Sequence, residues 1–231
     1  EINYRDWSSD VCSSDLLEAC GISCEGLFST FVEEHDLFFG GEEALRQALL
    51  EARVTKGDAL LGVAVNCASA LIGDDVRGIA FAAAAGVPVA VAEAGGFTGD
   101  FDDGYGKAFL AVLEALSPKR RPKAARAVNL IGFSPVEENA AKKLTEIQRQ
   151  LFRRGIEVRL TFGAPNTTVE SIRDAGDATL NVILHEGRGA AIAAWLRERL
   201  TQPSVSAPLS DAWQGTDGWI DAIEAALPPC R

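Results

Sequence analysis

Continuous apolar runs alternate with amphipathic stretches along most of this chain. Strands are predicted at residues 58–65, 87–92, 128–132, 156–162, 180–184 and 204–206. The apolar runs among them, such as residues 60–65 and 87–92, are typical of strands buried on both faces of a parallel sheet. Helical spacing of apolar residues predicts helices over residues 42–53, 75–85, 104–116, 137–152, 168–175, 190–200 and 216–227. Such alternation builds right-handed βαβ units. The pattern therefore predicts an α/β fold of Rossmann-like or flavodoxin-like modules, with parallel sheets flanked by helices.

A proline-bounded basic stretch, Ser117–Lys123, interrupts this alternation and contains no apolar residue. It predicts a surface crossing between two modules. We expect a partial first module over residues 17–121 and a second module over residues 122–231. Residues 6–16 resemble a translated sequencing adapter, so residues 1–16 are expected to be an artefact and are left out of the functional interpretation.

Composition narrows the class of protein. The 231 residues carry a formal net charge of −11, which argues against nucleic-acid binding because phosphates require a basic face. No apolar stretch reaches the length of a membrane span. The five cysteines are few and unevenly spaced, unlike a secreted disulfide framework. We therefore expect a cytoplasmic protein without a nucleic-acid or membrane partner.

Cys67 is the residue with the clearest chemical potential. It lies two residues after the apolar run 60–65, and a short loop with Gly73 is expected after it. Ligands bind at the carboxyl ends of parallel strands, and thiolate sulfur suits iron–sulfur clusters. The alternative is a small buried thiol beside a helix N-terminus. Cys20 and Cys24 form a C-x₃-C pair that does not by itself identify a metal.

Three other segments could contribute to a site. His185 follows the predicted strand 180–184, where an acid–base group or a ligand to a cofactor is useful, although it could equally be a surface loop histidine. The loop Gly95–Gly99 lacks the spacing of a dinucleotide fingerprint and predicts close approach of backbone to a ligand or neighbouring subunit. The pair Asp74–Asp75 suits acid–base chemistry or, alternatively, the N-terminus of the next helix.

Three segments resemble the component 1 superfamily of nitrogenase and nitrogenase-like reductases. Phe39–Leu45 is similar to the family element F-G-G-x-x-x-L, and Cys67–Asp75 is similar to C-x₃-[LV]-I-G-D-D. Gly96–Gly99 followed by Gly104–Tyr105 is similar to G-F-x-G…G-[YW]. Two apolar runs, residues 128–132 and 180–183, resemble strands of the family's second module. The similarity spans about residues 28 to 227.

The resemblance implies the catalytic component of an ATP-driven two-component reductase. Such a component receives electrons from a separate ATP-hydrolysing iron–sulfur protein. It works as a heterotetramer of two paralogous subunits, and an iron–sulfur cluster ([4Fe-4S] or P-cluster-like) bridges each pair. Cys67 falls on a cluster-ligating cysteine of the family. Cys20 and Cys24 are candidates for further ligands, and Gly96, Phe97 and Gly99 are candidates for contact with the cofactor.

The chain departs from the family pattern at two places. It reads Gly104–Lys107 where nitrogenase α subunits place a histidine, and His185 stands where they have a cofactor-ligating cysteine. Dinitrogen reduction on a metal–homocitrate cofactor is therefore not expected, and His185 is the candidate catalytic residue. A cofactor-assembly scaffold and a non-redox ligand-binding α/β protein are the alternative functions. The family's third module is expected to be missing.

Overall fold

The computed structural model describes residues 27–28, 30, 40–56, 60–65, 67–84, 86–121, 126–208 and 217–228. The helices are α3 (Glu42–Lys56), α4 (Cys67–Ile72), α5 (Val76–Ala84), α6 (Phe101–Leu116), α7 (Ala140–Arg153), α8 (Val169–Arg173), the 3₁₀ helix η1 (Asp174–Asp177), α9 (Glu186–Leu200) and α10 (Asp217–Ala226). The strands are β1 (Leu61–Ala64), β2 (Val89–Ala92), β3 (Ala127–Ile131), β4 (Glu157–Thr161), β5 (Leu180–Ile183) and β6 (Ser204–Ser206). Among these residues, no helix combines the length and apolarity that a membrane crossing requires.

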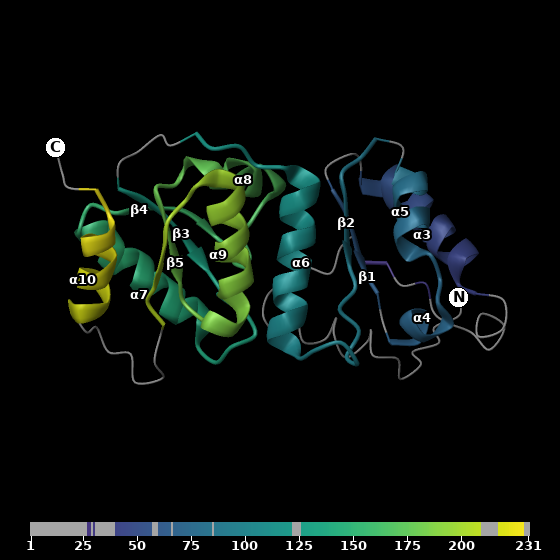
Figure 1. The fold of residues 1–231 in the computed structure, drawn as a ribbon, viewed down its shortest axis with the longest axis horizontal. Helices are drawn as coiled ribbons and strands as arrows, with labels where there is room; N and C mark the ends of the chain where they lie inside the picture. The colour runs from purple at the N-terminus through teal and green to yellow at the C-terminus, as the bar shows by residue number, and fades with distance from the viewer. Residues whose placement is uncertain are drawn as a thin grey trace.

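The strands form two parallel sheets (Figure 1). β1 pairs with β2, and the four-stranded sheet has the order β4-β3-β5-β6. Numbered within its own module, that order is 2-1-3-4, which is the flavodoxin-like arrangement. The predicted α/β fold with parallel sheets flanked by helices is therefore confirmed. The exact boundary between the two modules stays a prediction.

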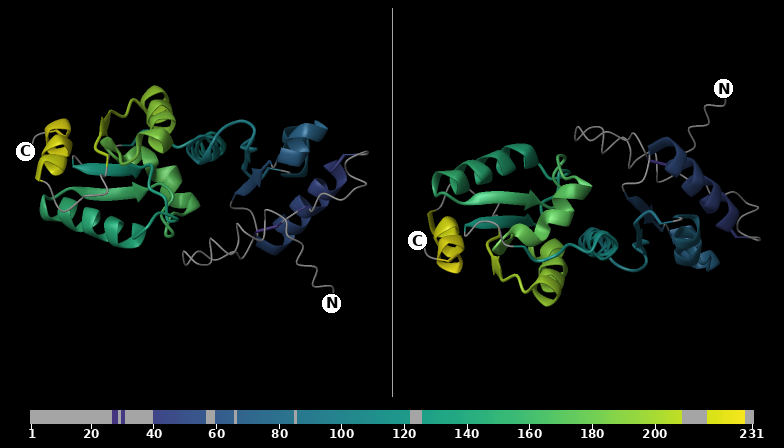
Figure 2. Two further views of the ribbon diagram at one scale, coloured as in Figure 1. Left: turned by 90° about the horizontal axis from the view of Figure 1, so that it is seen from below. Right: turned by 90° about the horizontal axis from the view of Figure 1, so that it is seen from above.

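Helices cover both faces of the four-stranded sheet (Figure 2). α7 and α10 pack on one face, and α6, α8 and α9 lie on the other. A separate core lies between the β1–β2 pair and helices α3 and α5. The fully buried large side chains of the four-stranded module include Leu130, Ile147, Leu180, Ile192, Leu196 and Ile223. Burial of these apolar side chains is what holds the layers together.

Helix α6 is shared between the two sheets (Figures 1 and 2). One side of it buries Leu113 and Leu116 in the core formed with α9. The opposite side turns Lys107, Leu110 and Glu114 toward β2. The two sets of residues recur at helical spacing and so lie on different sides of the helix. Helix α6 therefore packs into the core of the four-stranded module and also lines the groove beside β2.

Several element predictions differ from the structure. Helix α6 begins at Phe101 instead of residue 104, and α7 begins at Ala140 instead of residue 137. Residues 67–72 form the helix α4 instead of the expected loop, because alanine and leucine favour a helix once the strand has ended. Helix α9 begins at Glu186, not at residue 190, so His185 is its N-cap residue. The glycines at positions 187 and 189 weaken the helical pattern in the sequence, and only tertiary packing keeps that first turn helical.

A buried polar network ties the sheet to η1. Asn129 donates to the carbonyl oxygen of Ala175 at 2.9 Å and to Oδ1 of Asn181 at 3.0 Å. Gln202 donates to the carbonyl oxygens of Ala175 and Ala178 at 2.9 and 2.8 Å. The three amide side chains are fully buried. Their hydrogen bonds offset the free energy lost when polar groups leave water.

Replacing Gln202 with leucine should lower the free energy of unfolding by about 1–3 kcal/mol, because buried carbonyl groups lose donors while the volume is roughly kept. Chemical denaturation with an unchanged m-value would measure this. Gln47→Leu is the control, since Gln47 is exposed and its hydrogen bond among the described residues is to Glu43, also exposed, and it should change stability by less than about 0.5 kcal/mol. Equal effects of the two substitutions would contradict the role given to the network.

Candidate functional site

Cys67 lies at the end of the first sheet, where β1 leads into α4. Its thiol is half-buried and forms no disulfide. The backbone N–H of Gly96 donates to Sγ of Cys67 at 3.1 Å. A Cβ on Gly96 would stand 3.6 Å from the same sulfur, so the loop after β2 approaches the thiol through backbone. A hydrogen bond of this kind stabilises negative charge on sulfur.

The first two family-like segments also meet in space. The N–H of Gly41 donates to Oδ2 of Asp74 at 3.1 Å. Gly40 has φ +84°, and a Cβ there would lie 2.7 Å from Oδ1 of Asp74, so glycine is required at this turn. Asp75 accepts the N–H of Gly78 at 2.9 Å and thereby caps α5. The structure thus gives Asp74 and Asp75 structural contacts of the helix-capping kind.

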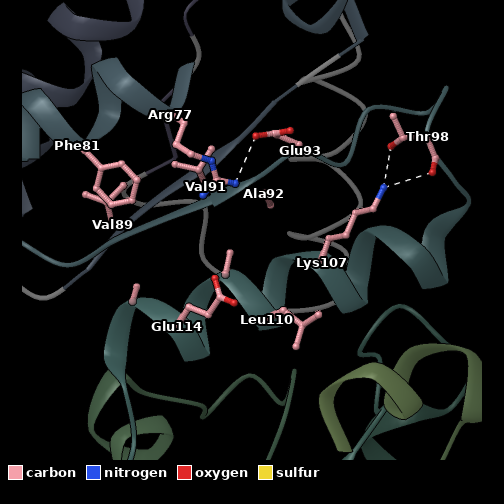
Figure 3. Close-up of a pocket in the computed structure, with 12 residues that line it drawn as sticks. Arg77, Phe81, Val89, Val91, Ala92, Glu93, Thr98, Lys107, Leu110 and Glu114 are labelled. Atoms are coloured by element: carbon pink, nitrogen blue, oxygen red, sulfur yellow. Dashed lines mark hydrogen bonds and ion pairs between the residues drawn. The ribbon is translucent and has the colours of Figure 1, made fainter. Parts of the chain in front are cut away.

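The glycine-rich loop is held in place by α6. Thr98 folds back on Gly95, with its N–H and its hydroxyl each 2.8 Å from that carbonyl oxygen. Lys107 then donates to the hydroxyl and carbonyl oxygens of Thr98 at 2.9 and 3.2 Å (Figure 3). We call these contacts the Lys107 brace. The brace fixes the turn that presents the N–H of Gly96 to Cys67.

The brace borders a groove of about 530 Å³ between β2 and α6 (Figure 3). Its floor is apolar, with Phe81, Val89 and Leu110, and an ion pair between Arg77 and Glu93 spans one side at 3.3 Å. The groove contains none of the predicted site residues.

The surroundings of Cys67 fit a single thiolate ligand, because the thiol is free, half-buried and accepts one backbone N–H. Leu71, about one helical turn after Cys67 in α4, is 74% exposed, and Phe97, next to Gly96, is 76% exposed. In the part of the chain that the structure describes, no three metal-ligating side chains gather at one place. Cys20 and Cys24 lie outside the described residues. Further ligands would therefore have to come from undescribed residues or from a partner.

A second candidate site lies at the topological switch point of the four-stranded sheet. After β3 the chain adds β4 on one side of it and then β5 on the other side. Ligands bind at such switch points in open α/β sheets. The loops after β3 and β5 enclose a cavity of about 460 Å³. Its lining includes Gly132, Phe133, Glu137, His185 and Arg188.

His185 is part of a charged cluster in this second site. Its Nδ1 lies 3.5 Å from Oδ2 of Asp102 on α6. Arg188, only 5% exposed, pairs with Glu137 and lies with Nε 3.8 Å from Oδ1 of Asp102. A buried guanidinium needs such carboxylate partners. The sequence reasoning missed Asp102, Glu137 and Arg188, although a cation three residues after His185 is a usable signal once α9 is known to begin at residue 186.

Tyr105 stands behind this cluster. Its hydroxyl is 2.8 Å from the carbonyl oxygen of Phe133 and 2.9 Å from that of Phe162. Burial raises the pKa of Tyr105 well above its ordinary value. The tyrosine is therefore held neutral and joins α6 to the loops after β3 and β4.

The candidate residues thus fall into two groups. Cys67 and Gly96 meet at the first sheet, whereas His185 lies at the second with partners of its own. Phe97 points its large exposed surface outward, and Gly99 precedes the N-cap of α6, Asp100. No described contact joins the two groups directly.

Comparison with known proteins identifies relatives. The family model described as "Nitrogenase component 1 type Oxidoreductase" matches residues 14–229. The chain is 30% identical over 163 residues to the nitrogenase molybdenum-iron protein alpha chain of Clostridium pasteurianum, which covers 69% of this chain and 30% of the relative. It is 27% identical over 180 residues to the nitrogenase iron-molybdenum cofactor biosynthesis protein NifE of the same organism, covering 77% and 38%.

A third relative is a light-independent protochlorophyllide reductase chain of Methylobacterium sp. (strain 4-46), 26% identical over 202 residues, covering 86% of this chain and 39% of the relative. The chain thus spans well under half the length of these curated relatives. Among solved structures, nitrogenase Cp1 at pH 6.5 superposes with a TM-score of 0.71 at 27% identity, covering 84% of this chain and 37% of the other. The chain belongs to the nitrogenase component 1 type oxidoreductase family.

Proposed function

We propose that this chain is part of the catalytic component of a nitrogenase-like, ATP-driven two-component reductase. In this proposal Cys67 is one thiolate ligand of an iron–sulfur cluster, either [4Fe-4S] or P-cluster-like. The observation that carries it is the hydrogen bond from Gly96 to Sγ of Cys67 at 3.1 Å, at a place where two family-like segments meet. Bound there, the cluster would supply one-electron transfer.

The remaining ligands and the partners follow from the same site. A single described thiol is an incomplete ligand set, so the cluster would be shared with a paralogous component 1 subunit in a heterotetramer. The exposed Leu71 and Phe97 give that partner apolar surface beside the thiol. Electrons would come from an ATP-hydrolysing iron–sulfur reductase protein, in the cytoplasm. Cys20 and Cys24 stay candidate ligands, and Gly96, Phe97 and Gly99 stay candidate cofactor contacts.

His185 is the proposed catalytic residue. It lies in the second cavity, apart from Cys67, and an imidazole there can exchange protons with a bound ligand. The relatives differ in the substrates that their names state, so the family alone does not select among them.

A metallocofactor-assembly scaffold is the second candidate function. The similarity to cofactor biosynthesis proteins named NifE favours it, at 27% and 32% identity for those of Clostridium pasteurianum and Nostoc sp.. A scaffold would release its cluster to an acceptor protein without reducing a substrate. A reductase would consume electrons from the iron protein in proportion to product formed.

Cys67→Ala in the full-length protein, assembled with its partner, should lower the bridging-cluster EPR signal and the cluster iron content about tenfold or more, because a first ligand contributes at least as much as its supporting residues. Iron analysis and EPR of the purified complex measure this. Cys230→Ala is the matched control, since no role is assigned to that cysteine, and it should keep both signals. Unchanged iron after loss of Cys67 would refute the proposal.

Lys107→Met should lower the midpoint potential of the cluster while leaving its iron in place. The substitution removes the Lys107 brace, and the N–H of Gly96 then stabilises the reduced, more negative cluster less well. Losing about 1 kcal/mol of hydrogen bonding corresponds to about 40 mV for a one-electron couple.

A redox titration followed by EPR measures the shift. Lys142→Met, on the exposed side of α7, is the control and should leave the potential unchanged. An identical potential in the two variants would show that the brace has no influence on the cluster.

A further inference from the structure

We propose that His185 and Asp102 form an acid–base pair that delivers protons to a reducible ligand in the cavity at the carboxyl ends of β3 and β5. Asp102 is the positioning residue of this pair, and Gly187 is the position that admits it. The inference rests on the proposed function, because the electrons that reduce the ligand would come from the proposed iron–sulfur cluster. It goes further by assigning the carboxylate that orients His185, the glycine that lets this carboxylate approach, and the direction of the proton transfer.

The position of His185 suits proton transfer. The residue is the N-cap of α9, directly after β5, and it lines the cavity at the switch point of the sheet. Its side chain is 46% exposed, so the ring reaches both the cavity and solvent. Nδ1 lies 3.5 Å from Asp102, a distance that tightens readily when a ligand binds. Orientation through Nδ1 leaves Nε2 for the ligand.

Two groups of α9 hold Asp102, and a glycine makes room for it. Arg188, buried in the first turn of α9, lies 3.8 Å from its Oδ1. The carboxylate also stands at the N-terminal end of that 15-residue helix, where negative charge is favoured. The approach is possible only because residue 187 has no side chain, since a Cβ on Gly187 would overlap Oδ2 of Asp102.

The other titratable groups around the cavity are less suited to the task. Tyr105 is buried, with its hydroxyl beside two backbone carbonyl oxygens. Glu137 is paired with Arg188. Glu138 and Lys143 also line the cavity, but no described contact orients either toward His185. Asp102 is therefore the charged group in contact with the imidazole. Arg188 lies next to Asp102, and Glu137 is paired with Arg188.

The step balances as one proton for each electron. The imidazolium of His185 breaks its Nε2–H bond and gives the proton to the ligand atom that gains an electron, with the proposed iron–sulfur cluster as reductant. The ring is left neutral, with Nδ1–H directed to Asp102. Because the side chain is partly exposed, the proton that returns to Nε2 can come from solvent.

Gly187→Ala tests the proposal without removing any charged group, because the new methyl must push the Asp102 carboxylate away from α9. Gly218→Ala is the matched control. Gly218 is likewise the second residue of its helix, and a Cβ there meets no atom of the described residues within 4 Å. Both substitutions exchange a helical glycine for alanine, so they differ only in the displacement of Asp102.

In the full-length complex, Gly187→Ala should lower the rate of substrate reduction about tenfold and His185→Gln about 100-fold. His185→Gln should also remove the limb of the pH–rate profile on which an acid must be protonated. Cluster content and cluster reduction by the iron protein should stay unchanged in both. Gly218→Ala should match the wild type. Wild-type turnover and pH profile in Gly187→Ala or His185→Gln would overturn the proposal.

A second readout does not depend on the cluster. The 231-residue chain has only two histidines, His35 and His185, so ¹⁵N NMR resolves both rings, and His35→Gln assigns them. In the neutral form, His185 should carry its proton on Nδ1, and Gly187→Ala, unlike Gly218→Ala, should shift it toward Nε2. An identical tautomer in both variants refutes the pair. A changed tautomer together with loss of the cluster role of Cys67 would refute the proposed function alone.

Discussion

The packing of α6 between the two sheets is the constraint on which both candidate sites depend. Leu113 and Leu116 bury this helix against α9, and each fully buried leucine contributes roughly 2 kcal/mol. The same helix carries Lys107, which holds the loop at Cys67, and Asp102, which meets His185. Apolar burial along one side of a helix thus sets the position of polar groups that serve two different sites.

Each site is built by a charged side chain that orients a neighbour. Asp74 fixes the glycine turn before α3, Lys107 fixes the turn that reaches Cys67, and Arg188 fixes Asp102. Isolated surface ion pairs contribute little to stability. The contacts of these three side chains instead fix where a neighbouring group lies. That placement decides whether a thiolate can bind a metal or an imidazole can reach a ligand.

Membership of the nitrogenase component 1 type family gives the two sites a common setting. The relatives of this chain range from a nitrogenase alpha chain to cofactor biosynthesis proteins, so function depends on local chemistry rather than on the fold. In this chain Gly104–Lys107 and His185 stand where the resemblance leads one to expect a histidine and a cysteine. Tyr105, within the first stretch, is hydrogen-bonded to backbone carbonyl oxygens of the loops after β3 and β4. His185 lies beside the carboxylate of Asp102.

The sequence by itself determined the fold class, the strand positions and the family-like segments, because apolar periodicity and glycine spacing are local properties. It placed β6 at residues 204–206 correctly. Only the tertiary structure decided that α9 begins at Glu186, that Asp102 faces His185, and that Lys107 supports the loop at Cys67. The contact between Asp102 and His185 joins residues far apart in the chain. The packing of α6 against α9, rather than neighbours in the sequence, brings these two side chains together.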